Sequence, residues 1–91
     1  MTIEQHRAEL EMLRGEIELL MSERQSLLRA AGAAAVFVAQ LDSSVLPENT
    51  YTAADILAHA LNALREDTLK DALEIVRPEF EGGASEEGRG R

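Results

Sequence analysis

Apolar residues recur at intervals of three and four along the N-terminal part of the chain. With Ile3 at position a of a heptad, whose positions run from a to g, ten of the twelve a and d positions from residue 3 to residue 41 are apolar, and the other two are Arg24 and His6. Two helices that supercoil around each other need this repeat of 3.5 residues, because it keeps one apolar stripe in contact along the pair. The pattern therefore predicts a coiled-coil helix over residues 3–43.

The a and d positions form the interface of a coiled coil, and we call this set of residues the seam. The residues expected to form the dimer interface are Ile3, Leu10, Leu13, Ile17, Leu20, Arg24, Leu27, Ala31, Ala34, Val38 and Leu41. Arg24 interrupts the apolar stripe. A single charged residue at an a position helps to fix the register of the two helices and lowers their stability.

Charged residues beside the seam predict how the two helices are oriented. Glu9, Glu16 and Glu23 occupy g positions, whereas Arg7 and Arg14 occupy e positions. In a parallel pair, a g residue faces the e residue five positions further along in the other helix, so that Glu9 meets an arginine. An antiparallel pair would set acid against acid. The pattern therefore favours a parallel homodimer.

The helix changes character after Ser26, where apolar residues spread beyond the seam to positions such as Leu28 and Phe37. A broad apolar face needs more neighbours than one coiled-coil partner provides, as in a helix bundle. Residues 30–35 are all alanine or glycine, and such small side chains let another helix approach closely. We therefore expect a second helix of the same chain to pack against this part of the first.

Pro47 and Asn49 predict a loop over residues 44–51. A second helix is predicted over residues 52–77, with Thr52 as its N-cap and Asp55 three residues later in a variant of the capping box. Apolar residues follow helical spacing throughout this segment. A break or second cap is possible at residues 66–68, and the helix is expected to end before Pro78, since proline interrupts helical hydrogen bonding.

These elements make the predicted fold all-α. A long N-terminal coiled-coil helix is followed by a helical hairpin in a single domain over residues 1–80. Two parallel copies would form a four-helix bundle at the C-terminal end, and a dimer of dimers through the face around Leu28 and Phe37 stays open. Residues 81–91 hold four glycines and no large apolar side chain. Such a segment cannot bury enough surface to become ordered, so a disordered tail is expected.

Composition narrows the environment and the partners. The chain has no cysteine, which favours a reducing compartment, and we expect it in the cytoplasm. Its longest nearly uncharged stretch, residues 30–41, is too short to cross a bilayer. The formal net charge is -8, and no cluster of Lys and Arg is present, so direct binding to nucleic acid is not expected. A protein partner with a basic surface fits this charge.

No cluster of residues resembles a catalytic, cofactor or metal site. The two histidines, His6 and His59, lack the neighbours that hydrolysis or metal binding requires, although Asp55 lies four residues before His59 on the same helical face. We therefore expect no enzyme activity, no cofactor and no bound metal. Tyr51 is an amphipathic ring in the predicted loop, and Tyr51, Asp55 and His59 are the candidate contacts with a protein partner.

Three functions follow from these features. The first is a homo-oligomeric interaction protein that acts as an adaptor, regulator or inhibitor of a larger protein. The second is an oligomer that binds or sequesters a small anion or nucleotide, with Arg24 and Arg29 of two copies brought together. The third is a nucleic-acid mimic whose carboxylates occupy the DNA-binding site of a target.

Overall fold

The structure is a computed structural model of one chain, and it describes residues 2–89, with side chains described as far as Glu81. Four helical elements follow one another, and no strand occurs in this part of the chain. They are α1 (Ile3–Ala39), the short 3-10 helix η1 (Glu48–Thr50), α2 (Tyr51–Asn62) and α3 (Glu66–Arg89). The predicted all-α fold is confirmed. The parallel dimer and the four-helix bundle concern two chains and stay predictions.

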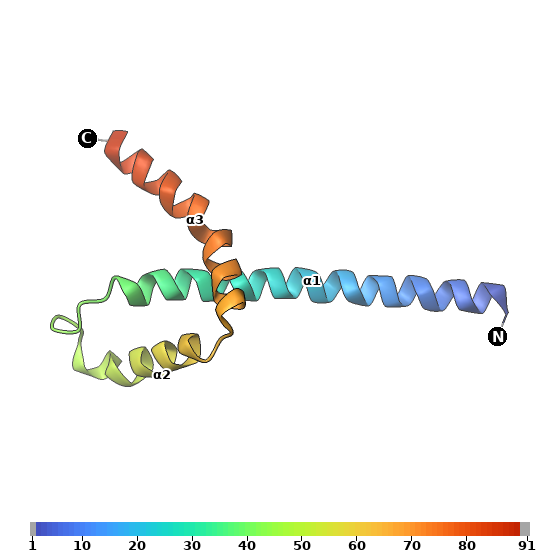
Figure 1. Ribbon diagram of the computed structural model, residues 1–91, viewed down its shortest axis with the longest axis horizontal. Coiled ribbons are helices and arrows are strands. Elements are labelled where there is room, and N and C mark those ends of the chain that lie inside the picture. The colour runs from blue at the N-terminus through green and yellow to red at the C-terminus, as the bar shows by residue number, and fades with distance from the viewer. Residues whose placement is uncertain (1, 90–91) are drawn as a thin grey trace.

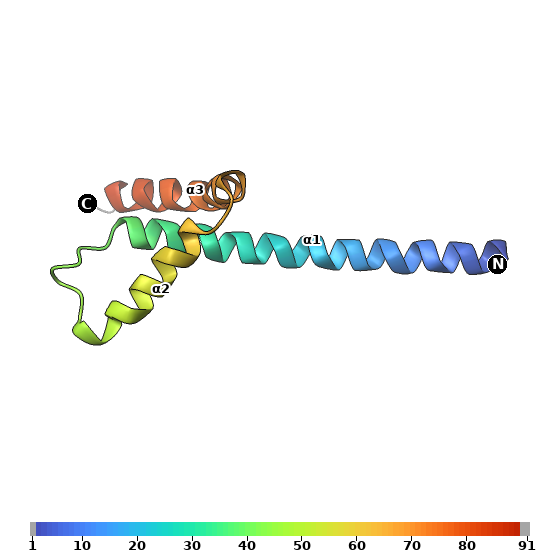
Figure 2. The ribbon, with the colours of Figure 1, turned by 60° about the horizontal axis from the view of Figure 1, so that its bottom comes forward.

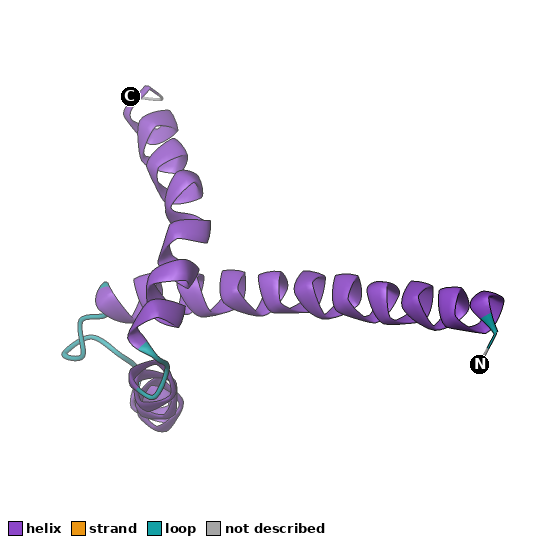
Figure 3. Ribbon diagram, turned by 45° about the vertical axis from the view of Figure 1, so that its right-hand side comes forward, coloured by secondary structure: helices purple, strands orange, loops and turns teal. Residues whose placement is uncertain are grey.

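Helix α1 confirms the prediction of one long N-terminal helix. It begins with a capping box, in which the Gln5 amide donates to Thr2 Oγ1 over 3.1 Å and the Thr2 amide donates to Gln5 Oε1 over 3.0 Å. These bonds satisfy two amides that a helix start otherwise leaves unpaired. The N-terminal half of α1 projects away from the other elements in every view (Figures 1, 2 and 3).

Helix α1 ends at Ala39, four residues before the predicted end at residue 43. The side chain of Asp42 explains the early end. Asp42 Oδ1 accepts a hydrogen bond from the Ser44 amide over 3.0 Å and another from Ser44 Oγ over 2.6 Å. An Asp that bonds to the backbone two residues on builds a local turn that competes with the helix.

The start of α2 differs from the prediction. The helix begins at Tyr51, and Thr50, which precedes it, already has helical backbone angles. The residues of η1 lead directly into α2, so Thr52 lies inside the first turn and caps nothing. Instead, Thr50 Oγ1 donates to the Pro47 carbonyl over 2.6 Å. The predicted N-cap at Thr52 is therefore wrong.

The single helix predicted over residues 52–77 is two helices that are separated at residues 63–65. The predicted break at residues 66–68 lies slightly too late, because Glu66 and Asp67 form the first turn of α3. Two acids at a helix start are favourable, since they face the positive end of the helix dipole. The separation turns the chain, so that α2 and α3 reach α1 from different directions (Figures 1 and 2).

The predicted end before Pro78 is also wrong, because α3 runs through Pro78 to Arg89. Proline removes one helical hydrogen bond, but the next turn is held by contacts with α1. Glu79 forms an ion pair with Arg29, and Phe80 lies beside Val36 and Gln40. For residues 82–91 no side chain is described, and residues 90–91 lie outside the described part of the chain altogether. The predicted disordered tail stays a prediction.

The core lies where α3 crosses α1. Figures 1 and 3 show that α3 crosses α1 steeply, whereas the sequence suggested a second helix running back along it. Ala72 and Val76 of α3 are 0% and 1% exposed, and Leu28 and Gly32 of α1 are buried opposite them. A side chain at Gly32 would lie 2.8 Å from the carbonyl carbon of Ala72 and nearer still to its oxygen. The small-residue run thus permits the close approach that the sequence predicted.

Candidate interaction surface

The seam residues in the N-terminal part of α1 are exposed along their whole length. Their exposed fractions run from 49% at Leu10 to 79% at Ile3. The exposed seam side chains in this part are Ile3, Leu10, Leu13, Ile17, Leu20 and Leu27. Seven-residue spacing places them on one stripe of the helix. An exposed apolar stripe of this kind is typical of surfaces that bind another protein.

Packing inside the chain uses other positions of the heptad. The buried residues of α1 are Leu28 at an e position and Gly32 at a b position. The neighbouring seam residue Leu27 is 62% exposed, and Ala31 and Ala34 are only half-buried. Helices α2 and α3 therefore cover the e side of α1. The seam beside them is open as far as Leu27 and is half-buried toward its C-terminal end, at Val38 and Leu41.

The charged residues beside the seam are not used within the chain. Glu9, Glu16 and Glu23 at g positions and Arg7 and Arg14 at e positions are all exposed. Among the described residues, the ion pairs join other groups, and none includes these five. Their charges are free to meet complementary charges on a second helix.

The exposed area of the chain is large for its mass. It amounts to 7657 Å², whereas a compact monomer of 10.0 kDa exposes about 5,200 Å². The radius of gyration is 19.6 Å, against ~12 Å for a compact chain of this length. The chain is therefore extended, and it exposes about 2,400 Å² more than a compact monomer of this mass would.

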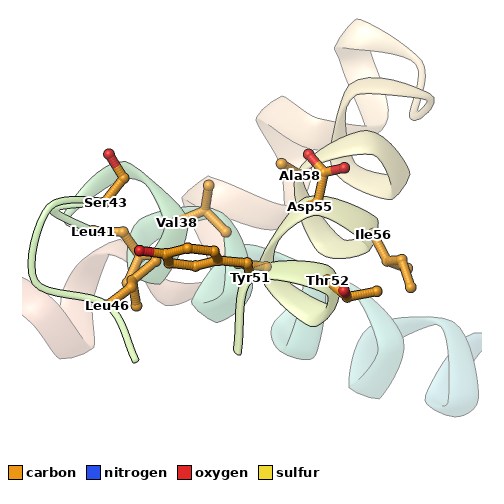
Figure 4. Close-up of a pocket in the computed structure, with 10 residues that line it drawn as sticks. Val38, Leu41, Ser43, Leu46, Tyr51, Thr52, Asp55, Ile56 and Ala58 are labelled. Atoms are coloured by element: carbon orange, nitrogen blue, oxygen red, sulfur yellow. The ribbon is translucent and has the colours of Figure 1, made fainter. Parts of the chain in front are cut away.

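A second apolar feature is a groove of about 570 Å³ at the C-terminal end of α1, between α1, the following loop and α2. Its apolar lining comes from Val38, Leu41, Leu46, Tyr51 and Ile56, together with the alanines Ala54 and Ala58. In the close-up of Figure 4, the Tyr51 ring extends toward Leu41 and Leu46, whereas Ile56 points in the opposite direction. The loop residue Leu46, which the sequence did not single out, forms one wall. We call this feature the Tyr51 groove.

Ser43, Thr52 and Asp55 are the polar residues that line the Tyr51 groove, all three are exposed, and His59 and Asp42 lie near them in the sequence. His59 Nδ1 lies 2.7 Å from the Asp55 carbonyl oxygen and 3.6 Å from Asp55 Oδ1, so the ring bonds chiefly to the backbone. Both side chains are exposed. At the loop, the two hydrogen bonds from Ser44 stabilise the charged carboxylate and lower the pKa of Asp42 below its ordinary value of 3.8. The candidate partner contacts Tyr51, Asp55 and His59 thus lie on one accessible surface of α2.

Arg24 and Arg29 contact carboxylates of α3. Arg24 lies 3.8 Å from Asp71, and Arg29 pairs with Glu79. Each arginine therefore already has an acidic neighbour in its own chain. This arrangement lowers the local positive charge that an anion site at the dimer interface would need, and it places both arginines at the α1–α3 contact.

No three His, Cys, Asp or Glu side chains within the described part of the chain come together as ligands of one ion. None of its helices is both long and apolar enough to span a bilayer. Comparison of the chain with protein-family models, curated proteins and solved structures gave no match. The seam and the Tyr51 groove are therefore the features on which a functional hypothesis can rest.

Proposed function

We propose that this protein is a parallel homodimer that acts by binding other proteins, as an adaptor, regulator or inhibitor, and not as an enzyme. Two copies of α1 pair through the seam. The C-terminal helices α2 and α3 then form a compact, acidic end on the dimer. The larger protein bound there carries a basic surface.

The exposed stripe of the seam is the observation that carries this proposal. Burial of apolar area contributes about 25 cal/mol per Å² to stability. In the single chain, the six large seam side chains from Ile3 to Leu27 lack about half or more of this contribution, since their exposed fractions run from 49% to 79%. A second α1 covers them together and leaves the polar positions of the heptad in water.

A second copy of the same chain fits the seam better than an unrelated helix does. In a parallel pair, Glu9 of each chain faces Arg14 of the partner subunit, so two ion pairs flank the seam. Each exposed pair contributes only about 0.2–1 kcal/mol, which is enough to favour one orientation. Apolar burial supplies the larger part of the affinity.

Cysteine cross-linking tests this arrangement, because the natural chain has no cysteine. Leu10→Cys and Leu20→Cys are each expected to form disulfide-linked dimers under mild oxidation. In a parallel pair in register, every seam residue faces its own copy across the interface, within the Cα separation of about 4.4–6.8 Å that a disulfide requires. Leu19→Cys is the matched control, since Leu19 is 70% exposed but occupies a c position away from the seam.

In an antiparallel pair, only residues at the two-fold axis face their own copies, so residues ten positions apart cannot both do so. Cross-linking at only one of Leu10 and Leu20 would therefore show an antiparallel arrangement. Equal cross-linking at Leu19 and at both seam positions would show that the disulfides form by chance collision. Either result would contradict the proposed parallel dimer.

A further inference from the structure

Near the end of α1, the apolar side chains on one side of the seam are covered, whereas a large apolar side chain on the other side is exposed. Helices α2 and α3 cover the e side, where Leu28 is buried and Ala35 lies beside Leu61. The g side carries Phe37, whose ring is 58% exposed. A Phe ring is among the most costly apolar groups to leave in water. No α2 or α3 residue buries it in the described chain.

The Tyr51 groove lies on the side of α1 that α2 covers. It opens between Val38 and Leu41 at the end of α1 and Leu46 and Tyr51 in the following segment (Figure 4). Val38 and Leu41 are themselves the last a and d residues of the seam. The groove is therefore continuous with the proposed interface, and a second α1 lying on the seam would run past its mouth.

Parallel geometry brings the exposed Phe ring to this groove. A g residue faces the e residue five positions further along in the other helix. For Phe37 that position would be residue 42, which follows the end of α1, so the helical rule gives only the direction of the ring, toward the groove residues Leu41 and Ser43. Both the ring and the groove are apolar, and each copy of the dimer has one of each. The two contacts are therefore related by the two-fold axis.

We infer that the Tyr51 groove is the binding site for Phe37 of the partner subunit, so that each copy completes the apolar surface of the other. This inference rests on the proposed parallel dimer. It assigns the second copy as the occupant of the groove, and it makes α2 part of the dimer interface. The result is an interlocked C-terminal end in which α1 and α2 of both copies contact one another.

A mixed cross-link tests the contact directly. One preparation carries Phe37→Cys, a second of different tagged mass carries Leu46→Cys, and the two are mixed, exchanged and oxidised. A disulfide between the two differently tagged chains is expected as the main product. Ala33→Cys replaces Phe37→Cys in the control, because Ala33 is exposed at a c position and faces away from the seam. The control mixture should give no mixed product.

Tyr51 supplies a second readout, since it is the only tyrosine and the chain has no tryptophan. In the wild-type dimer, Tyr51 fluorescence should be protected from acrylamide quenching. Phe37→Ala should raise the quenching constant to that of the dissociated Leu20→Lys variant, while the Phe37→Ala chain itself stays dimeric through the seam. The protection should return in Phe37→Leu, which restores an apolar side chain.

The outcomes separate this inference from the dimer on which it rests. A wild-type dimer with no mixed cross-link and with Tyr51 as open to quenching as in Leu20→Lys would overturn the inference and leave the parallel dimer intact. Such a result would show that the groove is open to another occupant. A wild-type chain that is monomeric at the concentrations used would overturn both.

Discussion

Replacing Gly32 with alanine is expected to lower the free energy of unfolding by about 1–3 kcal/mol, the usual effect of overpacking a close contact. The new methyl group would meet the backbone of Ala72, with its Cβ 2.8 Å from the carbonyl carbon. Backbone atoms cannot rotate away as a flexible side chain can. The two helices must therefore move apart, which also loosens Val76, 3.1 Å from the same point. Urea denaturation followed by circular dichroism measures the change.

Gly15→Ala is the matched control for this substitution. Gly15 also lies within α1, but nothing stands within 4 Å of a side chain built there. Its f position faces away from the seam. Alanine should therefore stabilise the helix by about 0.5–1 kcal/mol, the ordinary advantage of alanine over glycine in a helix. If both substitutions stabilised the protein, the close crossing of α1 and α3 at Gly32 would be wrong.

Replacing Leu20 with lysine is expected to raise the dissociation constant of the dimer about 1,000-fold or more. The change removes both leucines of the one seam pair that Leu20 forms with its own copy, and it places two like charges there. Loss of about 4 kcal/mol, within the range for large-to-small changes at a buried leucine, corresponds to a factor of about 1,000. The subunit itself should keep its helices, because Leu20 is 68% exposed in the single chain and its removal leaves no cavity.

Leu19→Lys provides an unusually close control. Leu19 and Leu20 are adjacent and are equally exposed in the single chain, at 70% and 68%, so solvent exposure alone predicts the same effect for both. Only pairing through the seam distinguishes them. Sedimentation velocity should show a dimer for Leu19→Lys and a monomer for Leu20→Lys. Equal behaviour of the two variants would remove the seam as the interface. In affinity capture, proteins bound by Leu19→Lys but not by Leu20→Lys are those that need the dimer.

The sequence predicts α1 well because its signal is local and repeated. The period of 3.5 runs from Ile3 to Leu41 without a shift in phase, and only the glycines Gly15 and Gly32 disfavour a helix inside it. The small-residue run around Gly32 likewise indicates a close helix contact, and the structure places Ala72 there. Neither feature shows which helix, or which residue of it, makes the contact. That information depends on the path of the chain after α1.

The later helix boundaries depend on tertiary contacts, and the sequence predicts them less well. Residues 62–65 contain neither glycine nor proline, yet the chain turns there and allows Leu61 and Ala72 to pack on α1 from different directions. Pro78 is a strong local stop signal, but contacts of Glu79 and Phe80 with α1 follow it within the helix. In both places packing outweighs the local preference of the backbone.

The Tyr51 groove likewise combines a residue that the sequence indicates with one that it does not. Tyr51 stands out in the sequence as an accessible aromatic residue, whereas Leu46 carries no signal, because a leucine in a loop follows no period. The groove exists only when the turn at Asp42 folds the loop back toward the end of α1. A site built from a helix end, a loop and a second helix is therefore visible only once the chain is folded.

Sedimentation equilibrium of the wild-type chain over a wide range of concentrations is the most direct test of pairing through α1. We expect a mass of two chains at micromolar concentration, with dissociation only on strong dilution or in the Leu20→Lys variant. Added salt should weaken the dimer slightly, since the ion pairs beside the seam are exposed and the apolar burial is not screened. A single species with the mass of one 10.0 kDa chain at all concentrations would contradict the proposed dimer.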